Sequence, residues 1–369
     1  MNEIYAAGPH VIEADIEIVA DAMRKWYGKD AYYYCELFQE EFASYHDRRF
    51  GIMTPNCTSA LRLLLDGLGI GPGDEVLVPE CTWIGSTAGI NEQGAQTVFC
   101  DIDSTTWCID PDSVRKSVTA RTKAIIAVNL YGNMADMVEL QKIADEHGLF
   151  LIEDAAESLG SILNGVKSGK FGVGSTFSFH RTKTLTTGEG GMLILDDEDL
   201  WDRCMFLRDH GRSRTIPYYV EEVAYKYMPF NVQAALGYAQ FQRLDELLDI
   251  KRSHFLHYKR ELGDIPGVHM NPEQDGVVNG YWITTLVLDG CENRSELLSN
   301  LHSMGIPARP FFYPLSSMPA YAQGDKYRLK NCVAYDVSPR GINLPGAMNM
   351  TEDQLQFVCD GVKNVIRTS

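Results

Sequence analysis

Six short apolar runs alternate with amphipathic stretches between about residue 51 and residue 210, and this alternation limits the possible folds more than any other feature. The amphipathic stretches carry apolar residues at helical spacing. Strands that are apolar on both sides and joined by helical crossovers predict a mostly parallel sheet covered on both faces. The strand candidates are 74–80, 95–102, 123–130, 149–154, 175–180 and 190–197, and the helix candidates are 59–69, 137–148 and the segment after Asp199.

The two ends of the chain follow other patterns. Residues 1–50 place apolar groups at helical spacing, and residues 232–262 form one long helical pattern. We interpret the long helix as the link to a smaller α+β lobe. That lobe would contain a strand-like run at 281–288 and a final helix near 352–366.

Length and composition limit the class of protein. A chain of 369 residues suits two domains, and we predict a large domain at 1–240, which includes the N-terminal helical segment, and a small C-terminal domain at 241–369. The net charge of -17 opposes binding to nucleic acid or to an anionic membrane. It does not exclude a phosphorylated small molecule, because a local pocket of amides and cations is enough to bind one.

Signals for targeting and metal binding are missing from the sequence. The N-terminal residues show no basic start followed by an apolar run, and no stretch approaches the roughly 20 apolar residues of a membrane span. The nine cysteines are scattered, without a Cys-x-x-Cys pair or zinc-like spacing. We therefore expect a cytoplasmic protein without membrane contact, disulfides or a structural metal.

A carboxylate stands at the end of the apolar run 149–154. Ligands of parallel sheets bind beyond the carboxyl ends of the strands, and Asp154 falls at such an end. Its charge is desolvated there unless a cation meets it. The protonated pyridine nitrogen of pyridoxal 5'-phosphate (PLP) is such a cation, and the paired carboxylate makes the ring an electron sink. The alternative is a helix cap or a turn, where Asp is also favoured.

Lys183 lies in a polar turn that follows the run 175–180 and leads into a glycine-rich stretch beginning at Gly188. A lysine that forms a Schiff base needs a short rigid turn that aims its amine at the cofactor carbon. A solvated lysine is the usual alternative. However, Asp154 lies 29 positions upstream, at the end of a neighbouring strand, and the two residues together favour PLP.

Three further features suit a phosphate and a flat ring. Small polar residues, including Thr58, lead directly into the helix 59–69, and free N–H groups at a helix N-terminus attract an anion. An ordinary N-cap is the alternative. Ser178 could donate its hydroxyl to a phosphate oxygen. Trp83 follows another strand, where its ring could stack on the pyridine or pack in the core.

The motifs NCTSAL, PECTWIGST, EDAAESLG, FSFHRTKTLTTGEGGM and RPFFYP occur in this order, and over most of its length the chain resembles the DegT-type (DegT/DnrJ/StrS) sugar aminotransferases. The resemblance implies an α/β protein of PLP-dependent transferase fold type I, the fold of aspartate aminotransferase. The C-terminal pieces 281–288, 308–321 and 338–345 are most similar to members that aminate C4 of GDP-4-keto-6-deoxymannose with glutamate as amino donor.

The resemblance also assigns roles to residues. Lys183 would bond to the cofactor and then carry a proton to or from the substrate carbon. The family forms homodimers in which each site borrows a loop from the partner, here residues 225–231. The remaining cofactor contacts would be Asp154 at the pyridine nitrogen, Glu157 near the phenolic oxygen, Trp83 on the ring, Cys57, Thr58 and Ser178 at the phosphate, and Lys226 from the borrowed loop. The residues expected to face the sugar nucleotide are His180, Arg309, Phe311 and Tyr313.

The chain departs from the family pattern at three places. Cys57 stands where relatives usually have Gly in the phosphate turn, so this turn must accept a side chain. The borrowed loop reads Lys-Tyr-Met-Pro at 226–229 in place of Asn-Tyr-Arg-Met, and the arginine is absent. His180 stands where an aromatic residue is common.

Four alternatives remain open at the level of sequence. A sister group of keto-sugar dehydratases has His in place of the Schiff-base lysine, and the presence of Lys183 argues against that reaction. Amination of another keto-sugar nucleotide, for example at C3, is the second alternative. An amino-acid aminotransferase of the same fold would need Arg309 or Arg340 to bind a carboxylate. A non-catalytic regulator would need a basic DNA-binding region, which the sequence lacks.

Overall fold

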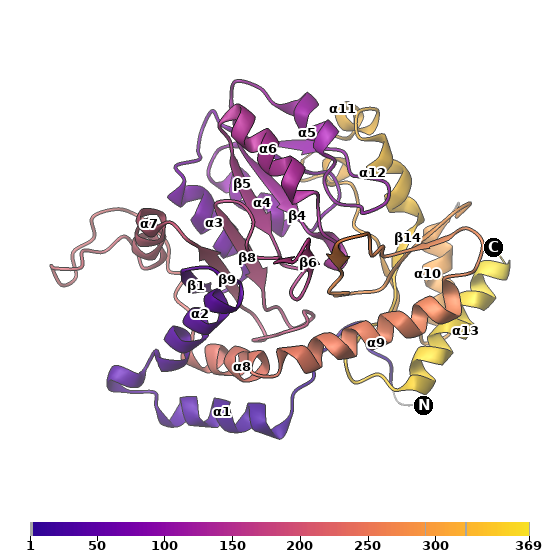
Figure 1. Ribbon diagram of the computed structural model, residues 1–369, viewed down its shortest axis with the longest axis horizontal. Coiled ribbons are helices and arrows are strands. Elements are labelled where there is room, and N and C mark those ends of the chain that lie inside the picture. The colour runs from indigo at the N-terminus through magenta and orange to yellow at the C-terminus, as the bar shows by residue number, and fades with distance from the viewer. Residues whose placement is uncertain (1–2, 292, 322, 369) are drawn as a thin grey trace.

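The computed structural model describes residues 3–291, 293–321 and 323–368 (Figure 1). Its α-helices are α1 (Glu13–Arg24), α2 (Tyr33–Tyr45), α3 (Cys57–Gly67), α4 (Gly85–Glu92), α5 (Pro111–Ser117), α6 (Met137–His147), α7 (Glu198–Arg208), α8 (Asn231–Phe241), α9 (Leu244–Leu262), α10 (Arg294–Ser303), α11 (Gly324–Arg328), α12 (Cys332–Val337) and α13 (Glu352–Thr368). Short 3-10 turns lie at Gly28–Asp30, Leu130–Gly132, Leu315–Ser317 and Ser338–Arg340. The strands are β1 (Phe50–Thr54), β2 (Glu75–Pro79), β3 (Gln96–Cys100), β4 (Thr122–Val128), β5 (Phe150–Asp154), β6 (Ile162–Leu163), β7 (Val166–Lys167), β8 (Gly174–Ser178), β9 (Gly191–Leu195), β10 (Val268–Met270), β11 (Val277–Val278), β12 (Thr285–Leu288), β13 (Arg309–Pro310) and β14 (Gly341–Asn343).

The main sheet has seven strands in the order β1-β9-β8-β5-β4-β2-β3. Strands β3, β2, β4, β5 and β8 run parallel, while β9 pairs antiparallel with both β8 and β1. All six strand candidates of the sequence form part of this sheet. The edge strand β1 was not predicted, because it starts soon after α2 and carries a glycine in its five residues.

Helices cover both faces of the main sheet, as the apolar strands predicted. Side chains of neighbouring residues in a strand point to opposite faces. Ile52 and Leu193 accordingly belong to the core that includes α3 and α6, whereas Met53 and Met192 pack with α2 and α8. The sheet is therefore buried on both sides, and ligands can reach it only at the ends of its strands.

A second sheet, β10-β12-β14-β13, forms a smaller unit with α9, α10 and α13 at the right of Figure 1. The helical pattern at 232–262 divides into α8 and α9 because the chain turns at Arg243, whose guanidinium pairs with the buried Asp15 at 2.9 Å. Two contacts connect the main-sheet unit with the C-terminal unit. Strand β11 pairs with β6, and Ile4, near the N-terminus, packs in the core of the C-terminal unit. A boundary between 240 and 241 stays a prediction.

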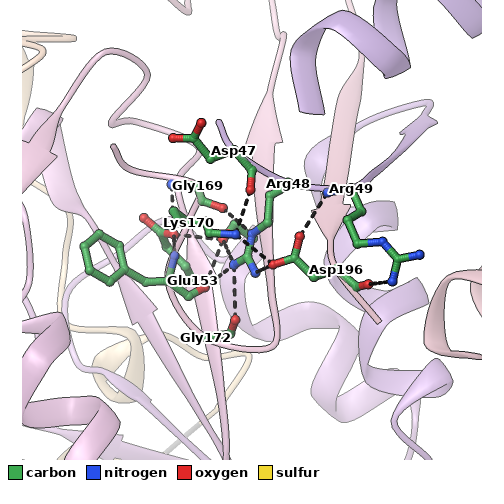
Figure 2. A network of polar contacts seen from close by, with 10 residues as sticks. Asp47, Arg48, Arg49, Glu153, Gly169, Lys170, Gly172 and Asp196 are labelled. Carbon is green, nitrogen blue, oxygen red and sulfur yellow. Dashed lines mark hydrogen bonds and ion pairs between the residues drawn. The ribbon is translucent and has the colours of Figure 1, made fainter. Parts of the chain in front are cut away.

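At the carboxyl end of β5, on the face opposite Asp154, a polar network holds the sheet (Figure 2). The carboxylate of Glu153 accepts hydrogen bonds from the Gly169 amide at 2.9 Å and the Ser175 hydroxyl at 2.8 Å. Arg48 donates to the Gly169 carbonyl at 2.8 Å and pairs with Asp196 at 2.9 Å. Glu153 and its neighbour Asp154 point to opposite faces, so this network fixes β5 from behind the face that carries Asp154.

Two classes of feature are missing from the part of the chain that the structure describes. No helix there has the length and apolar character needed to cross a lipid bilayer. The same residues contain no group of three or more His, Cys, Asp or Glu side chains that could hold a metal ion.

Lys251 is a buried amine on α9. Its Nζ donates to the Gly346 carbonyl at 2.7 Å, and none of the ion pairs formed by the described residues includes it. Burial lowers the pKa of Lys251 to about 7, with a smaller contribution from the charge of Lys183. The charged form of this amine is therefore disfavoured in the folded protein.

The pH dependence of stability should report this burial. Between pH 7 and about 10 the unfolded chain holds a proton that folded Lys251 lacks, so the free energy of unfolding rises with pH by up to about 1.4 kcal/mol per pH unit. Below pH 7 the amine is charged in both states and its contribution is constant. In Lys251→Met this rise should be missing. Urea unfolding of both proteins at several pH values checks the prediction, and equal slopes would contradict it.

Candidate active site

A cavity of about 400 Å³ lies beyond the carboxyl ends of β4, β5 and β8, where Val128, Asp154 and Ser178 line it. Residues of the C-terminal unit, among them Trp282 and Arg309, line it as well. Parallel sheets bind ligands at this edge, and the cavity lies where the sequence predicted a site.

Asp154 is a desolvated carboxylate at the end of β5. Its Oδ2 accepts a hydrogen bond from the Ser86 hydroxyl at 2.7 Å, and its Oδ1 accepts one from the Ala156 amide at 3.1 Å. Burial raises the pKa of Asp154, although these two donors oppose the shift. Both donors are neutral, and none of the ion pairs formed by the described residues includes Asp154. A ligand cation in the cavity would supply the missing positive charge.

Lys183 lies in the hairpin loop between β8 and β9. Its amide donates to the His180 carbonyl at 2.8 Å, and the Arg181 amide donates to the Gly188 carbonyl at 2.8 Å, so the loop is closed by its own backbone. The Lys183 Nζ is 3.2 Å from Glu157 Oε1, and its side chain is only 12% exposed. The loop therefore directs an amine into the cavity, and the solvated-lysine alternative is wrong.

Glu157 forms an ion pair with this amine. Its Oε2 accepts the Tyr131 amide at 3.0 Å, while its Oε1 faces Lys183. Burial raises the pKa of Glu157, and the charge of Lys183 opposes that shift. The carboxyl is thus fixed at both oxygens beside the cavity.

The N-terminus of α3 supplies amides. Asn56 caps the helix through its side chain, which accepts the Ser59 amide at 2.8 Å, and neither Cys57 nor Thr58 has an intrahelical acceptor for its amide. The Cys57 thiol points away, toward the Thr176 hydroxyl at 3.5 Å. This direction explains how the turn accepts a side chain where relatives usually have glycine. The backbone comes so close to β9 that a Cβ on Gly191 would lie 2.5 Å from the Cys57 nitrogen.

Trp83 lies open on the cavity wall. The residue is 61% exposed, and the ring centroid is 6.1 Å from that of Phe312. A core position is therefore excluded. Its stacking on a cofactor ring stays a prediction.

Two of the four residues expected to face the substrate line the cavity, namely His180 and Arg309. The His180 Nδ1 is 2.9 Å from the Thr182 hydroxyl and its Nε2 is 3.5 Å from Glu189, and burial lowers the pKa of its ring. Burial and the neighbouring charge of Arg181 lower the pKa of Arg309.

The prediction for Phe311 is wrong, because this side chain is buried, whereas the role of Tyr313 stays a prediction. Phe311 is fully buried, because its amide pairs with Gly341 and the missing side chain of that glycine leaves room for the ring in the core. The next residue, Phe312, points the other way and lines the cavity in its place. Tyr313 lies outside the cavity, with its ring 4.6 Å from the guanidinium of Arg294.

Lys226 does not line the cavity of its own chain. Its Nζ pairs with Asp209 at 2.8 Å. A contact with the cofactor phosphate in a partner chain therefore stays a prediction.

Sequence reasoning missed Ser86, Trp282 and Phe312. Ser86 follows Trp83 by three residues, inside a motif that was quoted for the tryptophan alone. Trp282 was assigned to a strand, but the strand begins only at Thr285, and the residue before Trp282, Tyr281, has a φ of 46°. Only the polar character of Ser86 and the size of the two rings could have pointed to them.

The chemistry of the cavity fits PLP. The buried carboxylate of Asp154 suits a protonated pyridine nitrogen, the amine of Lys183 suits the aldehyde, and the amides at the start of α3 suit the phosphate. All three groups are present around one cavity large enough for a small cofactor.

Comparison with known proteins agrees with this chemistry. The model of the DegT/DnrJ/EryC1/StrS aminotransferase family matches residues 9–363. GDP-perosamine synthases from Vibrio cholerae and from Escherichia coli O157:H7 are each 37% identical to the chain, over 90% and 89% of its length and the same shares of their own.

Solved structures are similar over the whole chain. Spr1654 from Streptococcus pneumoniae in its PLP-form gives a TM-score of 0.93 at 25% identity, covering 99% of both chains. The 3-amino-5-hydroxybenzoic acid synthase gives a TM-score of 0.92 at 27% identity, covering 100% of this chain and 99% of the other.

The hydrogen bond between Ser86 and Asp154 can be measured without any ligand. A buried hydrogen bond to a charged group contributes about 1.5–3 kcal/mol. We therefore expect a coupling free energy of this size in a double-mutant cycle of Ser86→Ala and Asp154→Ala, followed by urea unfolding of the cofactor-free protein. A coupling near zero would mean that the two side chains do not interact.

Proposed function

Since the chain belongs to the DegT/DnrJ/EryC1/StrS aminotransferase family, we propose that it transfers the amino group of glutamate to C4 of a nucleotide-linked 4-keto-6-deoxy sugar, as in GDP-perosamine synthesis. Family membership gives the fold, which is PLP-dependent transferase fold type I, the cofactor, which is PLP, and the class of enzyme, a sugar aminotransferase. The observation that carries the proposal is the amine of Lys183, which lies inside the cavity. The similarity of the chain to GDP-perosamine synthases supports the choice of substrate.

When bound, PLP acts as an electron sink that makes the proton on the amine-bearing carbon removable. The chain's own residues would do the rest. Asp154 would keep the pyridine nitrogen protonated, and the amides of Cys57 and Thr58 would hold the phosphate, with Ser178 at its side. Lys183 would accept the proton at one carbon and return it at another.

Arg309 supports a nucleotide-linked substrate. No acidic side chain among the described residues forms an ion pair with it, although it lines the cavity and sits within range of a second cation, Arg181. Arg181 likewise forms no ion pair with an acid within the described part of the chain. A bound dianion such as a diphosphate would stabilise these two guanidinium groups, which repel each other. His180 lies beside them and would contact the sugar.

The role of Lys183 can be tested by absorbance. Purified protein supplied with PLP should show the visible band of a lysine-bound cofactor, and glutamate should convert it to the band of the amine form. Lys183→Ala should lack the first band and all turnover. Lys251→Met, which removes another buried lysine, serves as the control and should keep the band. A wild-type protein that shows no such band would refute the proposal.

The substrate can be tested with a panel of keto-sugar nucleotides. We expect the amine form of the enzyme to return to the lysine-bound form with GDP-4-keto-6-deoxymannose, with a product that gains one nitrogen by mass spectrometry. UDP-linked and dTDP-linked keto-sugars, including 3-keto sugars, should react at least about tenfold more slowly, which corresponds to about 1.4 kcal/mol in the barrier. A product without added nitrogen would indicate dehydration.

We also propose a homodimer with shared sites. Large apolar side chains are exposed on the segment after α7, which projects to the left in Figure 1, and near the N-terminal helices. Such concentrations on a surface mark protein contacts. The exposed residues are Ile216, Tyr218, Tyr219, Val220, Val223 and Phe230 on the segment, and Trp26, Tyr27, Tyr32 and Tyr33 near the N-terminus.

Mixing two inactive variants tests the shared site. A mixed dimer contains one chain with Lys183→Ala and one chain with Lys226→Glu. If residues 225–231 complete the partner's cavity, both substitutions fall in the same site of that dimer, and its other site is intact. Random exchange of chains then restores about a quarter of the wild-type sites. Activity should rise to that level when the two are unfolded and refolded together, and not when each is refolded alone. Absence of recovery would show that both residues serve the same chain.

A further inference from the structure

Trp282 contacts the amine of Lys183 directly. The Nζ lies 3.5 Å from the centre of the Trp282 ring, nearer than the usual limit of about 6 Å for a cation above an aromatic face. The amine therefore has two contacts, one with the Trp282 ring and one with the Glu157 carboxylate at 3.2 Å. The two contacts come from segments more than a hundred residues apart.

The ring is fixed relative to the lysine loop. The Trp282 Nε1 donates to the carbonyl of Thr182, the residue before Lys183, at 2.8 Å. Its face also lies against Tyr131, with the ring centres 6.2 Å apart and the planes at 26°. Trp282 is thus bonded to the same loop whose lysine it contacts.

The backbone conformation just before Trp282 fixes the direction of its side chain. Tyr281 has a φ of 46°, which is unfavourable for a side chain of its size and persists only where the surroundings enforce it. Its ring stacks on Phe255 at 3.7 Å. A Cβ on Gly132 would lie 2.6 Å from the Tyr281 nitrogen, so this segment rests directly on a backbone that only glycine permits.

We propose that Trp282 is a positioning residue that holds the ammonium group of Lys183 whenever this lysine is not bonded to the cofactor. The proposal rests on the proposed role of Lys183. A lysine side chain is long and has many rotamers, and a single contact with Glu157 leaves most of them accessible. The ring face adds a second, electrostatic contact, which keeps the Nζ inside the cavity, where the ammonium form can return its proton to the substrate.

Labelling of lysines in the cofactor-free protein tests the contact itself. An amine-reactive reagent is applied at one pH, and peptides that contain Lys183 and the exposed Lys123 are compared by mass spectrometry. Relative to Lys123, Lys183 should react about tenfold faster in Trp282→Met, which removes the ring but keeps much of its volume. It should react within about threefold of the wild-type rate in Trp282→Phe, which keeps a ring face. Trp201→Leu, which removes an indole that stacks on Phe50, is the control and should not differ from wild type.

Kinetics of the PLP-loaded enzyme gives the second readout. Trp282→Met should lower kcat about tenfold or more while the KM for glutamate stays within about twofold, and Trp282→Phe should recover most of kcat. Wild-type labelling and kcat in Trp282→Met would overturn the proposal, as would equal effects of Met and Phe, because the hydrogen bond to Thr182 would then explain them. If Trp282→Met does not fold, Trp282→Phe decides, since a tenfold change in its labelling would overturn the proposal. Labelling needs neither cofactor nor substrate, so this result is independent of the proposed reaction.

Discussion

The carboxylate of Asp154 is the group on which the rest of the site depends. It is buried at the end of a central strand, where desolvation disfavours its charge. Two neutral donors and the nearby charge of Lys183 oppose that effect. A cofactor that carries a protonated nitrogen would offset this desolvation, which is why we predict that Asp154 pairs with the pyridine ring.

The architecture around this carboxylate serves to hold it still. On the other face of β5, Glu153 is surrounded by donors and tied to the Arg48 network of Figure 2. One strand therefore carries two adjacent carboxylates with opposite roles. Glu153 is satisfied by the protein and fixes the strand, whereas Asp154 faces the cavity and is left for a ligand.

The site is assembled from three parts of the chain that meet at one edge of the sheet. The start of α3 provides amides, the loop between β8 and β9 provides the lysine, and the C-terminal unit provides Trp282, Arg309 and Phe312. Because the second unit contributes part of the wall, its position relative to the main sheet shapes the cavity. This unit also reaches the lysine loop, since Trp282 contacts the amine of Lys183.

The sequence by itself determined the parallel sheet, Asp154 at a strand end and Lys183 in a tight turn. These features depend on short-range chain geometry, namely the period of a strand and the residues that form turns, which act over a few residues. Only the tertiary structure decided that Phe312 lines the cavity while Phe311 enters the core, that Ser86 supports Asp154, and that Trp282 contacts Lys183. Those outcomes depend on pairing with Gly341 and on packing across about a hundred residues of chain, which local spacing does not encode.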